Sequence, residues 1–477
     1  MVAESLIEFQ HVRGDAASTL VEQVVAAVRR AIERRALPPG AMLPSIRAFA
    51  SLHRVSVHTV ARAYGRLALD GWLTARPRLG YRVARPRPPR AAPAVCRPAA
   101  LDTQWRLCET HADSPPRLSP GCGWLPDDWL NQDGLRAALR HISRQPMRRM
   151  AHYGHPLGYA PLRAHIAATL GERGIAVDAQ RVLLTQGATQ GLDIVVRTLL
   201  RPGDTMAVEQ PCYANLFPIL RLAQVRAVPV PRGAAGLDCV ALERVARLHR
   251  PRLLFINTAL HNPTGTSLEA ANAAEVLALA ARHDFHIVED DVSRELLDGW
   301  SPSLAGLDGA RRVIYLGGYS KSIAPSLRVG YMVADDALLR VCARSKMMSG
   351  LTGPETMERL VHHVLLEGRH AAHTARLRDR LARAHEQIEA LLDAHGFEIC
   401  ARPRAGLFLW ARPAGRRAGR GADALARMAA DAGIWLTPGS LFDIDGRDLP
   451  WLRFNVAYSQ DPELWRFLRE AGAAGGT

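Results

Sequence analysis

From Leu118 onward the chain alternates short apolar stretches with stretches of helical periodicity, and this alternation restricts the possible folds more than any other feature. The apolar stretches lie at 182–185, 205–208, 226–230, 253–256, 286–289 and 313–316. Strands that are separated by helices pair in parallel, and the helices cover both faces of the sheet. We therefore expect an α/β domain with a mostly parallel sheet covered by helices.

The size and composition of the chain fit a globular protein with more than one domain. It has 477 residues, of which 48% are hydrophobic and 22% are charged. No apolar run reaches the length of a bilayer span, and the N-terminus lacks a signal-peptide pattern. The seven cysteines include no C-x-x-C pair, which predicts neither a disulfide framework nor a metal site. We expect a cytoplasmic protein.

Three helices and a β-hairpin are predicted in the first 85 residues. Apolar residues recur at helical spacing over 20–37, where a Pro-Pro-Gly run follows, and Ser45 and Ser56 are N-cap residues for two further helices. Two β-like pieces within 72–83 flank a basic turn. This order predicts a winged helix-turn-helix whose third helix enters the major groove of DNA. A small helical packing module is the alternative.

Positive charge is concentrated near the N-terminus. The net charge is +15, and the first 100 residues hold sixteen arginines against six acidic residues. Such an excess predicts a polyanionic partner, without choosing between DNA, RNA and membrane. Residues 86–117 are rich in Pro, Ala and Arg and show no periodicity, which predicts an extended linker. The predicted order is a DNA-binding domain at 1–85, the linker, and a larger domain at 118–477.

Lys321 is one of only two lysines, with Lys346, among sixty-one basic residues. An amine can lose its proton and attack a carbonyl, whereas a guanidinium stays charged and forms no imine. Lys321 lies in the small-residue sequence Gly-Gly-Tyr-Ser-Lys-Ser-Ile-Ala-Pro-Ser-Leu-Arg, which ends at Arg328. We therefore predict a reactive lysine. A solvated surface lysine is the alternative.

Three further polar sequences each follow a predicted strand. Gly-Ala-Thr-Gln-Gly at 187–191 opens a helix and can hold a phosphate, and His-Asn-Pro-Thr-Gly at 261–265 is a more specific turn. Glu-Asp-Asp at 289–291 places a carboxylate where the sheet opens, and a pyridine ring that is to stay protonated needs such an acid beside its nitrogen. Arg328 can bind a phosphate bidentately. Each alone could be an ordinary turn or surface charge. Their common place at strand ends predicts one ligand site.

The sequences at 37–50 and 55–64 resemble the GntR-type DNA-binding domain. This resemblance implies contacts to DNA from the second helix, the third helix and the wing. The implied residues are Arg47, Ser56, His58, Thr59, Arg62 and Gly80. Arg62 is also readable as a solvated charge. The chain departs from the family at Val57, where an arginine is usual, and this leaves the operator sequence open.

The sequence from Leu118 to the C-terminus resembles the fold-type I aminotransferases, which use pyridoxal 5′-phosphate (PLP). The resemblance implies a smaller C-terminal α/β subdomain beside the mostly parallel sheet. This resemblance implies that Lys321 forms the internal aldimine with PLP and that Asp290 pairs with the pyridine nitrogen. Asn262 would bond the ring 3′-oxygen, and Tyr213 would lie beside the ring. The residues implied at the phosphate are Ala188, Thr189, Ser320 and Arg328.

Three further positions follow from the same resemblance. Tyr153 matches a tyrosine that reaches the phosphate of the neighbouring subunit, which implies a homodimer. Arg453 matches the arginine that grips the substrate carboxylate. The family places a tyrosine, which bonds the 3′-oxygen, where this chain has Val292 and Ser293. We expect this loss to leave PLP binding intact and to slow transamination, so that full transamination is weak or absent.

The whole arrangement resembles the MocR subfamily of bacterial transcriptional regulators. It implies a PLP-dependent regulator that binds double-stranded DNA, senses an amino compound or PLP itself at Lys321, and forms homodimers, which are domain-swapped in that subfamily. An α- or ω-amino acid is the expected effector. One alternative is an active PLP-dependent aminotransferase with an appended DNA-binding domain. The other is a DNA-binding protein whose larger domain is an inert scaffold.

Overall fold

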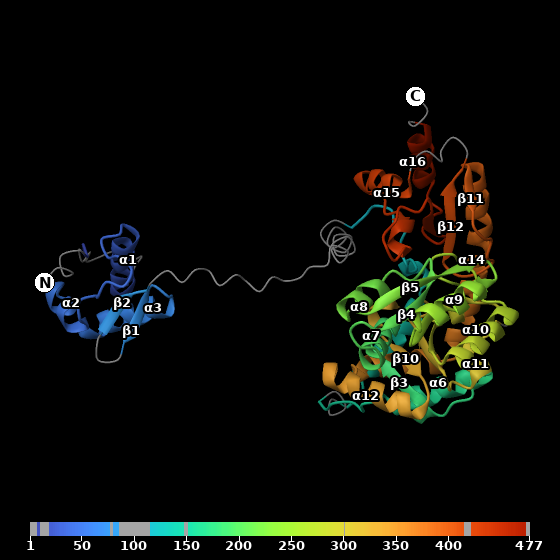
Figure 1. The fold of residues 1–477 in the computed structure, drawn as a ribbon, viewed down its shortest axis with the longest axis horizontal. Coiled ribbons are helices and arrows are strands. Elements are labelled where there is room, and N and C mark those ends of the chain that lie inside the picture. The colour runs from blue at the N-terminus through green and yellow to red at the C-terminus, as the bar shows by residue number, and fades with distance from the viewer. Residues whose placement is uncertain are drawn as a thin grey trace. The chain divides into compact units, whose positions relative to one another are not determined.

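A computed structural model of the chain forms two compact units, residues 1–97 and 98–477, and each is described by itself (Figure 1). The described residues are 7–9, 19–76, 80–84, 115–146, 151–299, 301–414 and 421–473. Most of the predicted linker therefore lies outside the described residues. Within the described ranges, no helix combines the length and the apolarity needed to cross a membrane.

The N-terminal unit contains three helices followed by a hairpin. Its elements are α1 (Leu20–Glu33), α2 (Ile46–Leu52), α3 (Val57–Leu69), β1 (Leu73–Arg76) and β2 (Gly80–Val83). Thr19 begins α1 in a capping box with Glu22, and the hydroxyls of Ser45 and Ser56 cap α2 and α3. The strands β1 and β2 pair antiparallel as far as Arg76 opposite Gly80, so the first two residues of the basic turn predicted at 75–79 are strand.

Aromatic and aliphatic side chains from all three helices form one core in this unit. Val28, Phe49, Tyr64 and Leu67 are inaccessible to solvent. The ring of Tyr64 lies 5.9 Å from Phe49 and 5.3 Å from Tyr81 of the hairpin, centroid to centroid. Such rings bury large apolar areas, so they fix the hairpin against the helices. The predicted winged helix-turn-helix is confirmed.

The larger unit is built on an eight-stranded sheet in the order β3-β10-β9-β8-β7-β4-β5-β6. Its strands are β3 (Val182–Thr185), β4 (Thr205–Gln210), β5 (Arg226–Gly233), β6 (Gly236–Leu237), β7 (Leu253–Asn257), β8 (His286–Asp290), β9 (Val313–Gly318) and β10 (Gly330–Val333). The six predicted strands are all present, and β4, β5, β7, β8 and β9 pair in parallel. The prediction missed β10, a four-residue antiparallel strand between β3 and β9.

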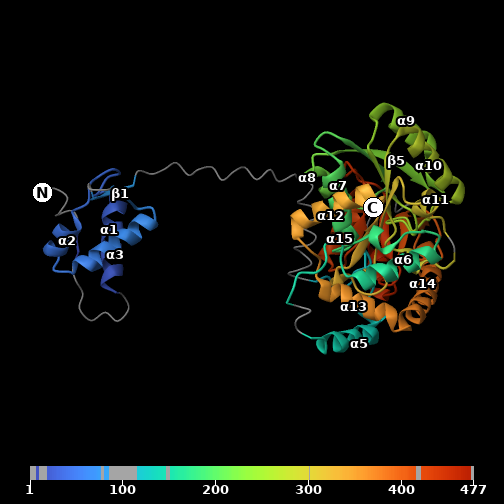
Figure 2. The ribbon, with the colours of Figure 1, turned by 90° about the horizontal axis from the view of Figure 1, so that it is seen from below.

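Helices cover both faces of this sheet, as Figures 1 and 2 show. One face packs against α7 (Ala188–Leu199), α8 (Leu216–Leu222) and α12 (Asp336–Gly350). The other packs against α5 (Gln132–Ser143), α6 (Ala160–Glu172), α9 (Cys239–His249), α10 (Ala270–His283), α11 (Leu304–Asp308) and α13 (Glu355–Leu366). Strands buried on both faces need apolar side chains at every position, which explains the continuous apolar runs of the sequence.

A smaller α/β subdomain lies at one end of the large sheet (Figure 1). It contains α14 (Arg369–Ala394), α15 (Ala422–Asp431), α16 (Pro462–Ala473) and a sheet of β11 (Phe397–Ile399), β12 (Phe408–Pro413), β14 (Leu452–Asn455) and β13 (Thr437–Pro438). The segment 117–125 joins this subdomain, because Leu118 bridges Ile434 and Gly121 donates its N–H to Trp435. The first residues after the predicted linker are therefore part of the subdomain's packing.

Candidate functional site

A cavity lies where the large sheet opens at the carboxyl ends of its strands. It brings together most of the site residues expected from the sequence: Ala188, Thr189, Tyr213, Asn262, Asp290, Ser320, Lys321 and Arg328. Asn257, Val292, Ser293, Gly318 and Phe408 complete much of its wall. Parallel strands end at one edge of the sheet, so residues scattered over more than a hundred positions meet there.

One end of the cavity is arranged to hold an anion. Gly187 precedes α7 with φ of 78°, and no side chain caps this helix, which leaves its first N–H groups directed at the cavity. Arg328 donates from Nη2 to the carbonyl of Gln186 at 3.1 Å. A Cβ at residue 187 would lie 2.4 Å from Arg328 Nη2, so only glycine admits the guanidinium so close to the turn.

The hydroxyl of Tyr213 lies within the same region. It accepts a hydrogen bond from Asn215 Nδ2 at 2.8 Å, and Thr189 Oγ1 lies 3.3 Å away. Burial raises the pKa of Tyr213, so the phenol stays protonated at neutral pH. The cavity therefore holds a fixed phenol even though Val292 and Ser293 supply none.

Asp290 and Lys321 line the same cavity and are both in environments that disfavour charge. Burial raises the pKa of Asp290 to about 7, and among the described residues its side chain accepts a single hydrogen bond, a long one of 3.4 Å from the N–H of Val292. Burial, followed by the positive charge of Arg453, lowers the pKa of Lys321 to about 8. A cation beside Asp290 would satisfy its charge, and Lys321 is partly an unprotonated amine near neutral pH.

Arg453 of β14 is a buried guanidinium, 7% exposed. No carboxylate in the described chain forms an ion pair with it; Nη1 donates to Asn262 Oδ1 at 2.8 Å, Nη2 donates to the carbonyl of Gly121 at 2.6 Å, and Nε has no partner. Burial lowers its pKa to about 10. A buried cation without a counter-charge is costly, so this position favours an anionic ligand.

The backbone of residues 121–123 lies across this cationic end of the site. Lys321 Nζ donates to the carbonyl of Gly123, Arg453 Nη2 to that of Gly121, and Asn455 Nδ2 to that of Cys122. A Cβ at Gly123 would lie 3.8 Å from Arg453 Nη2 and 4.0 Å from Lys321 Nζ. The carbonyls of Gly121 and Gly123 therefore serve as partners of Arg453 and Lys321, two groups that a ligand would also contact.

Tyr153 lies outside the cavity, and two residues that line the cavity were not predicted from the sequence. Tyr153 is 83% exposed and does not line the cavity of its own chain. Asn257, the last residue of β7, was missed, although it stands at a strand end shortly before the Asn-Pro turn. Phe408 was also missed, because it comes from β12 of the subdomain and no sequence pattern links it to the sheet.

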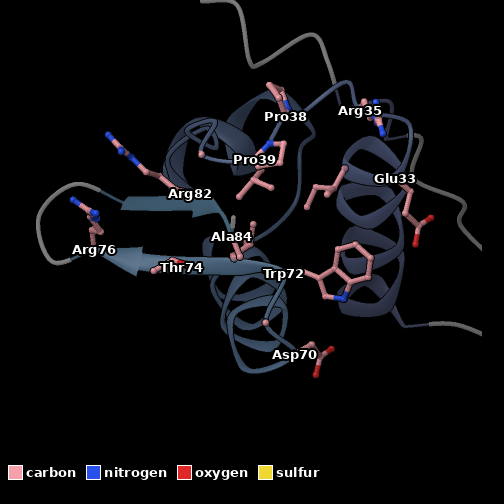
Figure 3. Close-up of a pocket in the computed structure, with 15 residues that line it drawn as sticks. Glu33, Arg35, Pro38, Pro39, Asp70, Trp72, Thr74, Arg76, Arg82 and Ala84 are labelled. Carbon is pink, nitrogen blue, oxygen red and sulfur yellow. The ribbon is translucent and has the colours of Figure 1, made fainter. Parts of the chain in front are cut away.

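In the N-terminal unit, Arg47, His58, Arg62 and Gly80 are exposed. Ser56 and Thr59 are less free, because their hydroxyls lie 2.7 Å apart and Ser56 also caps α3. A hollow of this unit, shown in Figure 3, is lined by side chains of both charges: Arg76 and Arg82 of the hairpin, and the carboxylates of Glu33 and Asp70. Arg47 of α2 and His58 and Arg62 of α3 do not line this hollow.

Two family models match the chain. The model "Aminotransferase class I and II" matches residues 125–470, and "Bacterial regulatory proteins, gntR family" matches residues 20–83. The chain belongs to the class I and II aminotransferase family. Its N-terminal unit adds a GntR-type DNA-binding domain, and the two together place it in the MocR subfamily of HTH-type regulators.

Curated and solved relatives agree with both parts. The uncharacterized HTH-type transcriptional regulator YjiR of Escherichia coli is 29% identical, over 96% of this chain and 98% of YjiR. The probable rhizopine catabolism regulatory protein MocR of Rhizobium meliloti is 29% identical, over 80% of this chain and 78% of MocR. The crystal structure of the α-aminoadipate aminotransferase LysN of Thermus thermophilus, complexed with N-(5′-phosphopyridoxyl)-L-leucine, has a TM-score of 0.68 and 30% identity, covering 75% of this chain and 91% of LysN.

The cofactor of this family is PLP, and the cavity fits it. The uncapped start of α7 and Arg328 suit the phosphate, and the poorly satisfied carboxylate of Asp290 suits a protonated pyridine nitrogen. Lys321 supplies the amine, with a pKa already lowered to about 8. The start of α7, Arg328, Asp290 and Lys321 line one cavity, so the groups that PLP requires lie together there.

Proposed function

We propose that this protein is a transcriptional regulator that binds double-stranded DNA through its winged helix and senses an amino acid in the PLP site. The observation that carries the sensing function is Arg453, a buried guanidinium without a carboxylate partner in the described chain, beside Lys321. An amine next to an anion site is complementary to an amino acid. The LysN complex with a phosphopyridoxyl-leucine adduct supports this class of ligand.

The roles of the site residues follow from their positions. When bound, PLP supplies an aldehyde that condenses with amines and a ring that withdraws electrons. We propose that Lys321 holds the aldehyde carbon, that Asp290 keeps a proton on the pyridine nitrogen, and that Asn262 orients the 3′-oxygen. The groups proposed at the phosphate are Ala188, Thr189, Ser320 and Arg328, with Tyr213 beside the ring. Arg453 binds the carboxylate of the amino acid.

Binding is coupled to the rest of the chain through residues 121–123. A ligand carboxylate at Arg453 competes with the Gly121 carbonyl, and a ligand at Lys321 competes with the Gly123 carbonyl. The competing carbonyls belong to the segment that directly follows the predicted linker. We propose that their release moves this segment and is transmitted to the chain that precedes it, because coupling requires contacts that differ between two states.

Cys122 reports on this release, since it is buried and flanked by the two carbonyls. We expect pulsed alkylation of Cys122, located by mass spectrometry, to accelerate at least several-fold when PLP and an amino acid are both added. Cys212 is an internal control, because it is also buried but lies after β4, in the hydrophobic core between the large sheet and α7, α8 and α12. Equal protection of both thiols in every state would contradict the coupling.

The same proposal includes a homodimer. Tyr153 is exposed, and α12 and the residue after it expose the apolar side chains of Met347, Met348 and Leu351. A second copy would bury this surface and could bring its Tyr153 to the phosphate site. We also propose the division into a DNA-binding domain at 1–85, a linker at 86–117 and a PLP-binding domain at 118–477. A regulator of this kind acts where the bacterial DNA is, in the cytoplasm.

The alternative of an efficient aminotransferase is tested by turnover. Val292 and Ser293 line the cavity where the family has a tyrosine, so the 3′-oxygen lacks one phenol donor. A charge-assisted hydrogen bond contributes about 1.5–3 kcal/mol, or roughly ten- to a hundred-fold in rate. We expect amino acids to change the absorption spectrum of the PLP-loaded protein with less than about one turnover per minute. Keto-acid production on the order of ten per second, typical of enzymes, would favour the aminotransferase.

A further inference from the structure

Asn257 joins the two parts of the PLP site that come from neighbouring strands. It is the last residue of β7 and lies opposite Asp290, the last residue of β8. Its side chain is 4% exposed, and it donates from Nδ2 to the carbonyl of Asp290 at 2.5 Å. Its Oδ1 accepts from the N–H of Asn262 at 2.8 Å. One planar amide therefore uses its donor on the Asp290 backbone and its acceptor on the Asn262 backbone.

The backbone of Asn257 is held by a fully buried ion pair. Glu209 Oε1 accepts the N–H of Asn257 at 2.7 Å, and Arg232 Nη1 donates to its carbonyl at 3.0 Å. Arg232 Nη1 lies 2.7 Å from Glu209 Oε2, and both side chains are inaccessible to solvent. Burial alone would raise the pKa of Glu209, but nearby His261 and Arg232 hold it below its ordinary value. A charged pair of this kind fixes the position of the residue that it surrounds.

The connection continues from Asn257 to the anion site, because Asn262 Oδ1 accepts from Arg453 Nη1 at 2.8 Å. We propose that Asn257 is a positioning residue that sets the spacing between Asp290 and Asn262, and thereby the affinity of the pocket for PLP. This inference rests on the proposed PLP site. No other side chain of the cavity, in the part of the chain that the structure describes, bonds both residues. Only an amide has a donor and an acceptor in the required geometry, so aspartate is a shape-matched replacement that keeps the acceptor and loses the donor.

The test uses the full-length protein and PLP alone as the probe. We expect Asn257→Asp to weaken PLP binding about ten-fold or more at neutral pH, since it loses a hydrogen bond and adds a negative charge beside Asp290. The added charge raises the pKa of Asp290. As the pH is lowered, Asn257→Asp should therefore lose PLP affinity at a higher pH than the wild type does. Asn257→Ser, which adds no charge, should weaken binding without this displacement of the pH profile.

Asn272 of α10 provides the matched control, because its amide also bridges a donor and an acceptor of the backbone. Its Nδ2 donates to the carbonyl of Leu237 at 2.7 Å, and its Oδ1 accepts from the N–H of Leu237 at 3.0 Å. Asn272→Asp should lower the unfolding temperature of the PLP-free protein and leave PLP affinity and its pH profile unchanged. Asn272 is absent from the lining of the PLP cavity.

The outcomes separate this inference from the function on which it rests. If the wild type does not bind PLP, the proposed function fails. If the wild type binds PLP and Asn257→Asp keeps both its affinity and its pH profile, the positioning role is overturned. If neither Asn257 variant folds while Asn272→Asp does, the role is also overturned, because Asn257 then serves the fold.

Discussion

The two candidate sites use charge in opposite ways. In the N-terminal unit, Arg47 and Arg62 stand exposed to water on short helices over a separate core. At the PLP site, Asp290 lines the cavity and Arg453 lies near Lys321, and both are buried. Burial raises the pKa of the acid to about 7 and lowers that of the arginine to about 10. Exposed cations attract any polyanion and are screened by salt, whereas a buried unpaired charge selects a ligand of matching shape.

The largest expected effect concerns Lys321. Lys321→Ala should abolish the visible absorption band of bound PLP, because no other amine of the described residues lines the cavity. Lys346→Ala is the control, since the only other lysine is buried and donates to the carbonyl of Pro156 at 2.9 Å. That variant should lose stability and keep the band. A band that follows Lys346 and not Lys321 would reverse the assignment.

A second prediction concerns the carboxylate of the effector. Arg453→Gln should weaken the spectral response to amino acids by roughly ten- to a hundred-fold, because a charge-assisted hydrogen bond contributes about 1.5–3 kcal/mol. Simple amines without a carboxylate should respond equally in wild type and variant, which is the matched control. Titration followed by absorbance measures both. An equal loss for amines and amino acids would show that Arg453 acts on the cofactor instead.

A third prediction tests the exposed charges by salt. In the full-length protein, Arg47→Ala should weaken binding to DNA from the chain's own promoter region several-fold, and should reduce the slope of log affinity against log salt by about 1. Arg340→Ala removes the same charge from an exposed position on α12 and should change little. Fluorescence anisotropy at several salt concentrations measures both. Equal effects of the two variants would remove the distinction between the units.

The smallest effect concerns pH and contrasts with the salt response. The reactive form of Lys321 is the unprotonated amine, and its pKa is lowered from 10.5 to about 8 by burial and by Arg453. The rate of PLP attachment should therefore rise with pH with a midpoint near 8, a few-fold between neutral and mildly alkaline pH. Because the group is shielded from solvent, the midpoint should move little with salt. A midpoint near 10 would show that the cavity does not perturb this amine.

Local patterns predicted much of this molecule. The spacing of apolar residues and the caps Ser45 and Ser56 are properties of short windows, and they placed α2 and α3 correctly. The six apolar runs became strands for the same reason. The strand β10 was missed although it is as long as β3 and consists of Gly, Tyr, Met and Val. No helix stretch was predicted between it and the Lys321 segment, and its antiparallel pairing with β3 and β9 defines it as a strand.

By itself, the sequence determined which residue types carry the chemistry: a rare lysine, an acid at a strand end, and arginine in place of other cations. Tertiary structure alone decided which of them meet. The pairing of β7 with β8 places Asn257 against Asp290, and the packing of the subdomain on the large sheet lets Arg453 of β14 reach Asn262 and Gly121. These contacts join residues up to 332 positions apart, and no local pattern encodes them, because they follow from closure of the sheet and subdomain around one cavity.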